Sequence, residues 1–289
     1  MEKKQPDYLS AHKFVHLICI CNSQPTISSQ RRHFVLVHGA GHGAWCWYKI
    51  TTLLQFDGHN VTALDLTASG INPRQIRDLN FSSVLDYIQP LMEFMASLKP
   101  RERVILVGHS LGGLGLSVAM ERFPEKIYAA IFVTAVMPGP NLTYFTITEE
   151  QTRRLGSLLD SQYIYDQGRN NSPTALRFRP VFLASKLYQL SPPEDFSLAL
   201  SLLRPFPVFT DEALVLKETK LTKDKYGSVR RVFIVCDQDL TIDEGLQRWM
   251  IERNPPTEVK VINGTDHMVM FTRPLKLFSY LGQIAEKYY

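Results

Sequence analysis

Six short apolar segments, separated by stretches of helical character, constrain the fold of this chain more than any other feature. They are rich in Val, Ile, Leu and Phe, and several are apolar without alternation, which is typical of strands buried on both faces of a parallel sheet. Strands alternating with helices predict a doubly wound α/β fold with a mostly parallel sheet. The predicted strands are His33–His38, Val61–Leu66, Val104–Val107, Ala130–Val136, Val232–Cys236 and Val259–Ile262.

Start and stop signals mark the helices between these strands. Asn80 is a candidate N-cap for the second predicted helix, and Gly58 and Pro124 follow the ends of the first and third. The predicted helices are Trp45–Phe56, Phe81–Leu98, Leu111–Phe123, Leu246–Arg253 and Leu275–Glu286.

The interval from about residue 138 to residue 226 breaks the strand–helix rhythm. Its periodicity is mainly helical, with proline breaks at 192–193 and 205–207. It is too long for a simple crossover between two strands. We therefore expect an inserted, mainly helical cap over the carboxyl end of the sheet, within a domain that spans residues 33–289.

The first 32 residues have a basic start and a short apolar stretch that loosely imitates a signal peptide. His16 interrupts that stretch and no small-residue cleavage site follows it. A mobile N-terminal extension is the interpretation we favour for residues 1–32.

Composition narrows the choice of partners and compartment. The 289 residues carry a formal net charge of only +4 and no long basic stripe, so we expect no nucleic-acid partner. No apolar run is long enough to span a bilayer, so we expect no membrane association. Cys19 and Cys21 are too close for an ordinary disulfide, whereas Cys46 and Cys236 lie in apolar stretches. This usage favours a reducing compartment, and we expect the cytoplasm.

Ser110 is the candidate nucleophile. It lies in Gly108-His109-Ser110-Leu111-Gly112, directly after the strand Val104–Val107 and directly before a helix. This is the strand–turn–helix setting of a nucleophile elbow, in which a tight turn lifts the serine hydroxyl to the end of the sheet. The alternative, a glycine-rich packing turn, is less consistent with this context.

A second glycine-rich loop, His38 to Gly43, follows the first strand. Such a loop can direct a backbone N–H toward the serine, so we assign the two donors of an oxyanion hole to Ala40 and Leu111. Neither the dinucleotide spacing nor a P-loop lysine is present to support phosphate binding. His38 is expected to support the loop by hydrogen bonding, and His42 is expected to contact the substrate.

An aspartate and a histidine are the other candidate catalytic residues. The strand Val232–Cys236 ends in Asp237-Gln238-Asp239, and either aspartate is a candidate because Asp237 could equally serve a turn. His267 lies in a loop beyond the last strand. The order serine, aspartate, histidine matches a triad in which His267 takes the Ser110 proton during attack on an ester. This chemistry needs no metal and no cofactor.

The chain resembles the plant methylesterases of the α/β-hydrolase superfamily, which are related to plant hydroxynitrile lyases. The resemblance covers nearly all of residues 33–289. It implies the α/β-hydrolase fold, hydrolysis of small-molecule methyl esters (such as those of jasmonate, salicylate, indole-acetate or alkaloid acids), a possible homodimer, and Asp239 rather than Asp237 as the triad acid. The motifs that carry it are H-F-V-L-V-H-G-A-G-H-G-A-W at His33–Trp45, V-T-A-L-D-L-T-A-S-G at Val61–Gly70, V-I-L-V-G-H-S-L-G-G at Val104–Gly113, K-L-Y-Q-L-S-P-P-E-D at Lys186–Asp195 and D-H-M at Asp266–Met268.

Several positions bear on the reaction and the substrate. The similar lyases carry Thr at the position of Gly39 and Lys at that of Met268, so these residues favour an esterase over a cyanohydrin lyase. Salicylate-binding members resemble this chain less at Leu158, Val136 and Tyr163, where they carry Trp, Phe and Phe. Smaller side chains at Leu158 and Val136 predict an acyl group bulkier than salicylate. A lyase and a ligand-binding receptor with a slow triad are the alternatives.

Overall fold

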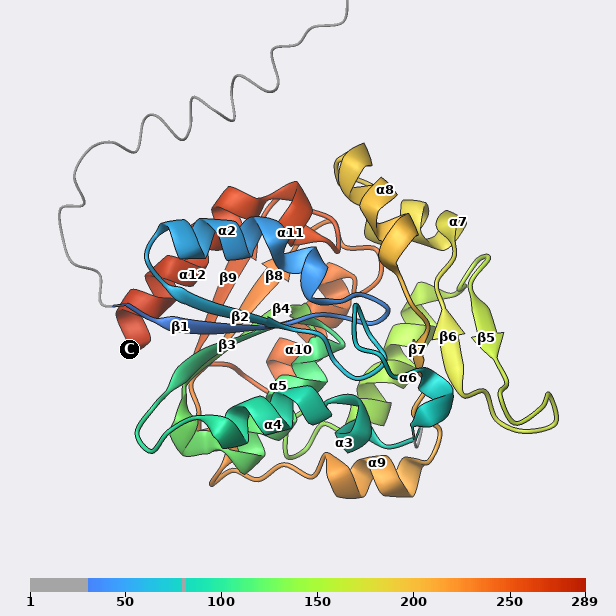
Figure 1. Ribbon diagram of the computed structural model, residues 1–289, viewed down its shortest axis with the longest axis horizontal. Helices are drawn as coiled ribbons and strands as arrows, with labels where there is room; N and C mark the ends of the chain where they lie inside the picture. Colours follow the sequence, from blue (N-terminus) through green and yellow to red (C-terminus); the bar gives the residue numbers. More distant parts are fainter. Residues whose placement is uncertain (1–30, 80–81) are drawn as a thin grey trace, which may run out of the picture. The chain divides into compact units, whose positions relative to one another are not determined.

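The computed structural model describes residues 31–79 and 82–289. Their centre is a six-stranded sheet with the order β2-β1-β3-β4-β8-β9, in which every neighbouring pair is parallel (Figure 1). All six predicted strands are present, which confirms the doubly wound α/β fold. The strands are β1 (His33–Val37), β2 (Asn60–Leu64), β3 (Val104–Ser110), β4 (Ile127–Ala135), β8 (Arg231–Cys236) and β9 (Glu258–Ile262).

The sheet is buried on both faces, which explains why its strands are apolar without alternation. Successive side chains of a strand point to opposite faces, so both sets of residues must be apolar when helices cover both faces. Alternate residues of β1 and β3 accordingly enter two separate core clusters, with Val35, Val37, Val104 and Leu106 in one and Phe34, Leu36, Ile105 and Val107 in the other.

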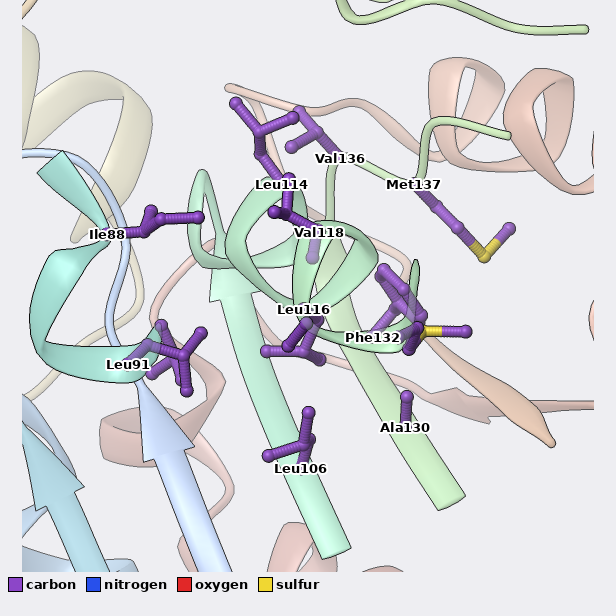
Figure 2. Packing of buried hydrophobic residues seen from close by; sticks show 14 of the residues in the cluster. Ile88, Leu91, Leu106, Leu114, Leu116, Val118, Ala130, Phe132, Val136 and Met137 are labelled. Carbon is purple, nitrogen blue, oxygen red and sulfur yellow. The ribbon is translucent and has the colours of Figure 1, made fainter. Parts of the chain in front are cut away.

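Two groups of helices cover these faces (Figure 1). Figure 2 shows Leu116 and Val118 of α5 gathered with Leu106 of β3 and Phe132 of β4 in the first cluster. The helices on that face are α4 (Gln89–Ser97), α5 (Gly112–Arg122) and α10 (Glu244–Arg253), and those on the other are α2 (Tyr48–Phe56), α11 (Val269–Thr272) and α12 (Pro274–Tyr288). Short 3-10 turns are η1 (Ala44–Trp47), η2 (Ile76–Asp78), η3 (Pro124–Lys126) and η5 (Tyr226–Ser228).

The single helix predicted over Phe81–Leu98 is wrong. The chain forms α3 (Val84–Tyr87), then breaks at Ile88 before α4. Pro90 lacks an N–H and its ring disfavours a continuous helix through the preceding turn, so a new helix starts with Pro90 in its first turn. The N-cap of α3 is Ser83, whose hydroxyl accepts a hydrogen bond from the Asp86 N–H; Asn80 lies outside the described residues.

The cap interval between β4 and β8 contains helices and also a small sheet that the sequence analysis missed. Its strands are too short, at two or three residues each, to give a periodic signal. They form an antiparallel sheet of order β5-β6-β7, with bounds Gln162–Ile164, Ala175–Arg177 and Phe206–Pro207. The helices are α6 (Tyr144–Leu155), α7 (Pro180–Phe182), the π-helical turn η4 (Leu183–Leu187), α8 (Pro193–Leu202) and α9 (Glu212–Glu218).

Residues 1–30 of the predicted extension, with Cys19 and Cys21, lie outside the described residues, whereas the Arg32 N–H donates to Nδ1 of His59. Cys46 and Cys236 are buried free thiols. In the described part of the chain, none of the helices has the length and apolar character needed to cross a bilayer.

The connectivity of the sheet creates one switch point. From β1 the chain passes to β2 on one side and then returns to β3 on the other side of β1. Val37 pairs with Gly108, so the loops that follow β1 and β3 leave the sheet side by side. In doubly wound sheets, ligands bind at this place, outside the carboxyl ends of the strands.

Candidate active site

Ser110 occupies a strained turn at the end of β3. Its φ is +53°, in the left-handed region that residues with a Cβ rarely adopt. The turn is tight enough to require the neighbouring glycines: a Cβ on Gly112 would lie 2.7 Å from the His38 carbonyl oxygen, and one on Gly113 would lie 2.1 Å from that of Val136. Only glycine permits these approaches, so the elbow predicted from sequence is present.

His267 and Asp239 form a buried pair beside this turn. The Nδ1 of His267 lies 2.6 Å from Oδ2 of Asp239, and both side chains are almost fully buried. They come from the loops after β9 and β8, which are adjacent parallel strands. Because a carboxylate only accepts, Nδ1 carries the proton and Nε2 is left as the acceptor in the neutral ring.

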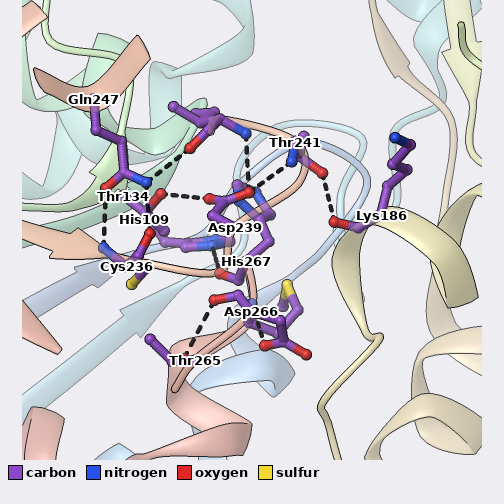
Figure 3. A network of polar contacts seen from close by, with 12 residues as sticks. His109, Thr134, Lys186, Cys236, Asp239, Thr241, Gln247, Thr265, Asp266 and His267 are labelled. Carbon is purple, nitrogen blue, oxygen red and sulfur yellow. Dashed lines mark hydrogen bonds and ion pairs between the residues drawn. The ribbon is translucent and has the colours of Figure 1, made fainter. Parts of the chain in front are cut away.

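The Asp239 carboxylate is fully satisfied (Figure 3). Oδ2 also accepts a hydrogen bond from the Thr134 hydroxyl at 2.5 Å, and Oδ1 accepts from the N–H groups of Thr241 and Ile242 at 2.7 and 2.9 Å. Asp237, the other candidate, instead accepts from the N–H groups of Gly264 and Thr265, which is the turn role considered for it.

The amides of Ala40 and Leu111 are available as donors. Within residues 31–79 and 82–289, neither N–H has a hydrogen-bond acceptor, although both residues line the same pocket as Ser110. Unpaired backbone N–H groups are rare unless a ligand or solvent completes them. Two free donors beside a nucleophile are what a developing oxyanion requires.

Two fully buried histidines hold the backbone around the site by hydrogen bonds, and one of them, His109, also lines the pocket. His38 places Nδ1 2.8 Å from the Gly39 carbonyl oxygen and accepts at Nε2 from the Leu66 N–H, as expected of a loop support. His109 donates from Nε2 to the His267 carbonyl oxygen at 2.8 Å, which holds the backbone at His267. Burial lowers the pKa of both rings, so both are neutral.

The pocket above these groups has a volume of about 310 Å³ and a largely apolar lining. Ser110 and His267 line it, with Ala40 and Leu111, and the cap supplies most of the other lining residues. All four predicted substrate contacts line it, namely His42, Val136, Leu158 and Tyr163. Asp239 lies behind His267 and does not line the pocket.

Comparison with known proteins agrees with this geometry. Residues 34–279 match the model of the alpha/beta hydrolase family. The chain belongs to that family. The hydrolase is 57% identical to methyl jasmonate esterase 1 of Vitis vinifera over 91% of this chain and 100% of that protein. It is 48% identical to salicylic acid-binding protein 2 of Nicotiana tabacum over 89% of this chain and 98% of that protein.

Solved structures resemble the chain at a similar level of identity. Tomato methylketone synthase I in complex with 2-tridecanone has a TM-score of 0.85 and 50% identity, covering 90% of this chain and 99% of that one. With esterases and methylesterases among its relatives, this hydrolase belongs with the plant methylesterases that its sequence motifs resemble.

The sequence analysis did not identify three residues of the hydrolase site as functional positions. Thr134, at the end of β4, bonds to Asp239 across 105 positions of sequence, and a hydroxyl closing an apolar strand was its only signal. His109 lies inside the elbow motif. Tyr188 lies in a cap motif that carried the family resemblance, yet nothing in its residue type indicated that its hydroxyl would reach His42.

Proposed function

We propose that this chain hydrolyses methyl esters of small plant acids by a double-displacement reaction on Ser110. The observation that carries the proposal is that three features meet in the lining of one pocket: a strained serine, a histidine hydrogen-bonded to a buried carboxylate, and two unpaired backbone N–H groups. The chain is a carboxylic ester hydrolase of the methylesterase type, as its esterase relatives support.

Acylation begins with proton transfer. Nε2 of His267 accepts the Ser110 proton as Oγ bonds to the ester carbonyl carbon, and the carbonyl electrons move to oxygen. The Ala40 and Leu111 N–H groups stabilise the resulting oxyanion, and Asp239 stabilises the cationic imidazole. The intermediate collapses with loss of the alkoxide, which takes the proton from His267 and leaves as methanol.

Deacylation repeats these steps with water. His267 accepts a proton from the water as its oxygen attacks the acyl carbon, and the same two amides hold the second oxyanion. Collapse breaks the bond to Ser110 Oγ, which regains its proton. The free acid leaves and the resting enzyme returns.

Jasmonate is the acyl group that we place first. The pocket has a largely apolar lining in which Val136 is buried and Leu158 half-buried. The family resemblance implies larger aromatic residues at these two positions in the salicylate-binding members. Its volume of about 310 Å³ is at the lower end of the range for ligand pockets, which suits a single small acid. The 57% identity to a methyl jasmonate esterase supports the same choice.

Two residues speak against cyanohydrin cleavage. Met268 is fully buried in a core cluster and does not line the pocket, so the position next to His267 offers no charge to an anion. A Cβ on Gly39 would lie 2.7 Å from the Ser110 Cβ, so a threonine there would displace the nucleophile from its present position.

A cytoplasmic location and a homodimer complete the proposal. The buried free thiols of Cys46 and Cys236 suit a reducing compartment. Light scattering of the purified protein tests the dimer, and a fluorescent fusion tests the location.

The test of function is release of free acid from methyl jasmonate, methyl salicylate and methyl indole-acetate by the purified protein beside Ser110→Ala. We expect turnover that is highest with methyl jasmonate and lost in the variant. Preference for methyl salicylate would contradict the size argument. Absence of turnover on every ester, with both proteins folded, would replace the enzyme by a receptor, which a ligand-induced shift in melting temperature would then detect.

A further inference from the structure

The loop that carries the Ala40 donor, residues 38–43, has three successive carbonyl groups that each accept a hydrogen bond, two from histidine rings of the loop and one from the cap. The Gly39 oxygen accepts from Nδ1 of His38 at 2.8 Å. The Ala40 oxygen lies 2.8 Å from Nδ1 of His42. The Gly41 oxygen accepts from the Arg204 N–H of the cap at 3.0 Å. We call residues 38–43 the oxyanion loop.

These bonds determine where the Ala40 N–H points. In a trans peptide the C=O and the following N–H point in opposite directions. Holding the Gly39 oxygen therefore directs the Ala40 N–H the other way, and holding the Ala40 oxygen fixes the peptide on the other side of the same Cα. The direction of the Ala40 N–H is therefore set directly at the Gly39 oxygen, which also accepts from the His42 N–H at 3.3 Å. The His42 ring restrains that direction through the adjoining peptide, whose oxygen it holds.

The tautomer of His42 is set by its two partners. Nδ1 faces a carbonyl oxygen, which can only accept, so Nδ1 carries a proton. Nε2 lies 2.6 Å from the Tyr188 hydroxyl. Burial lowers the pKa of His42 to about 3, so the ring is neutral, Nε2 is an acceptor and Tyr188 donates. The ring also stacks between Trp45 and Tyr188.

We propose that Tyr188 of the cap is a positioning residue for the oxyanion hole. Its hydroxyl, by donating to His42, maintains the tautomer whose Nδ1–H holds the Ala40 carbonyl and so orients the Ala40 amide. The inference rests on the proposed esterase function. His42 lines the pocket, whereas Tyr188 is not among the described residues that do, so Tyr188 acts through His42 and not on the substrate.

Tyr188 comes from the cap, just after η4, while the oxyanion loop follows β1. Together with the Arg204 N–H, it gives the cap two hydrogen-bonded contacts with this loop, at His42 and Gly41. Correct seating of the cap is therefore a condition for a competent oxyanion hole, and not only for a closed pocket.

The direct test is Tyr188→Phe, which removes one oxygen and keeps the stacked ring. Removing an oxyanion donor outright costs about 10²–10³ in kcat, so misdirecting one should lower kcat by about tenfold with little change in KM. Tyr48→Phe is the matched control, since it removes a hydroxyl bond between α2 and the cap residue Asp195 without touching the loop. We expect that control to keep the wild-type kcat.

Binding provides a readout that does not depend on turnover. The Ser110 Oγ can attack the carbonyl carbon of a trifluoromethyl ketone analogue of the substrate, and the serine proton then passes to His267. The oxyanion that forms occupies the oxyanion hole. By calorimetry, Tyr188→Phe should lower the affinity for this ketone by the same factor as it lowers kcat. The affinity for the product acid should stay unchanged. Equal ketone affinity in variant and wild type would overturn the inference.

A second pair of variants tests the tautomer even if Tyr188→Phe folds poorly. The amide nitrogen of Asn can take the place of Nδ1–H, whereas that of Gln extends toward the Nε2 position. His42→Asn should therefore retain more kcat than His42→Gln, and adding Tyr188→Phe to His42→Asn should cost nothing further. Equal losses of kcat in His42→Asn and His42→Gln would refute the role of His42. A wild-type protein that binds the ketone but hydrolyses no ester would refute the proposed function alone.

Discussion

The hydrogen bonds around Asp239 make Asp239→Asn a sharp test of the proposed triad. Oδ1 faces two backbone N–H groups, so the oxygen of an asparagine must occupy that side and its NH₂ must take the place of Oδ2. There it faces Nδ1 of His267 and the Thr134 hydroxyl. Thr134 can rotate to accept, but His267 can accept at Nδ1 only by moving its proton to Nε2.

That exchange disables the base. With the proton on Nε2, the ring has no lone pair directed at the pocket and cannot take the Ser110 proton. In the serine-protease triad the equivalent change costs about 10⁴ in kcat, which corresponds to about 5.4 kcal/mol of transition-state stabilisation. Stability should fall by only about 1–3 kcal/mol, because the buried hydrogen bonds are rearranged and not abolished.

The assay is release of acid from methyl jasmonate together with urea unfolding, with Asp237→Asn as the control. Asp237 accepts two N–H bonds at Oδ1, and an asparagine oxygen can accept both, so kcat should change by less than about threefold. An Asp239→Asn enzyme that keeps a tenth of the wild-type kcat, or an Asp237→Asn enzyme that is equally impaired, would refute the reasoning.

Three further predictions follow from other contacts. Ser110→Gly should be more stable than Ser110→Ala by about 1 kcal/mol in urea unfolding, since only glycine relieves the φ of +53°; equal stabilities would contradict the strain. The double change Leu158→Trp with Val136→Phe should move the kcat/KM ratio toward methyl salicylate by about tenfold, and an unchanged ratio would remove these residues from specificity. The Lys287 hydrogen bond lowers the pKa of Glu258 to about 2, so ionised Glu258 stabilises the fold above its unfolded pKa of 4.5, and this stabilisation is lost as pH falls toward 2. Glu258→Gln should therefore have a lower free energy of unfolding than wild type at pH 7 and a similar one at pH 2. A difference in unfolding free energy that persists at pH 2 would exclude the ionic origin.

Local sequence predicted the framework of this protein well because the relevant signals are short in range. A strand buried on both faces must be apolar throughout, and a turn as tight as the one at Ser110 must be rich in glycine. Pro90 was also a local signal for a helix break, but the apolar periodicity on both sides of it concealed the division between α3 and α4. The strands of the cap sheet were too short to give any pattern.

What the residues alone left open were choices between near-equivalent groups. Asp237 and Asp239 are two positions apart at the end of one strand, and only the family resemblance favoured the second. The folded chain separates them, because the turn after β8 directs Asp239 to His267 and Asp237 to the backbone of residues 264–265. Such a choice depends on where the next strand ends, which no local pattern encodes.

The sequence by itself determined the strands, the elbow and the chemical types present at the carboxyl end of the sheet. The tertiary structure decided which nitrogen of each histidine carries a proton, and hence which one can act as a base and which can only hold a loop. The physical reason is that a histidine tautomer is fixed by the hydrogen-bond partners of its two ring nitrogens. Asp239 lies 28 positions from His267 and meets it only where the ends of β8 and β9 lie side by side, and Tyr188 meets His42 across 146 positions only once the cap has packed on the sheet.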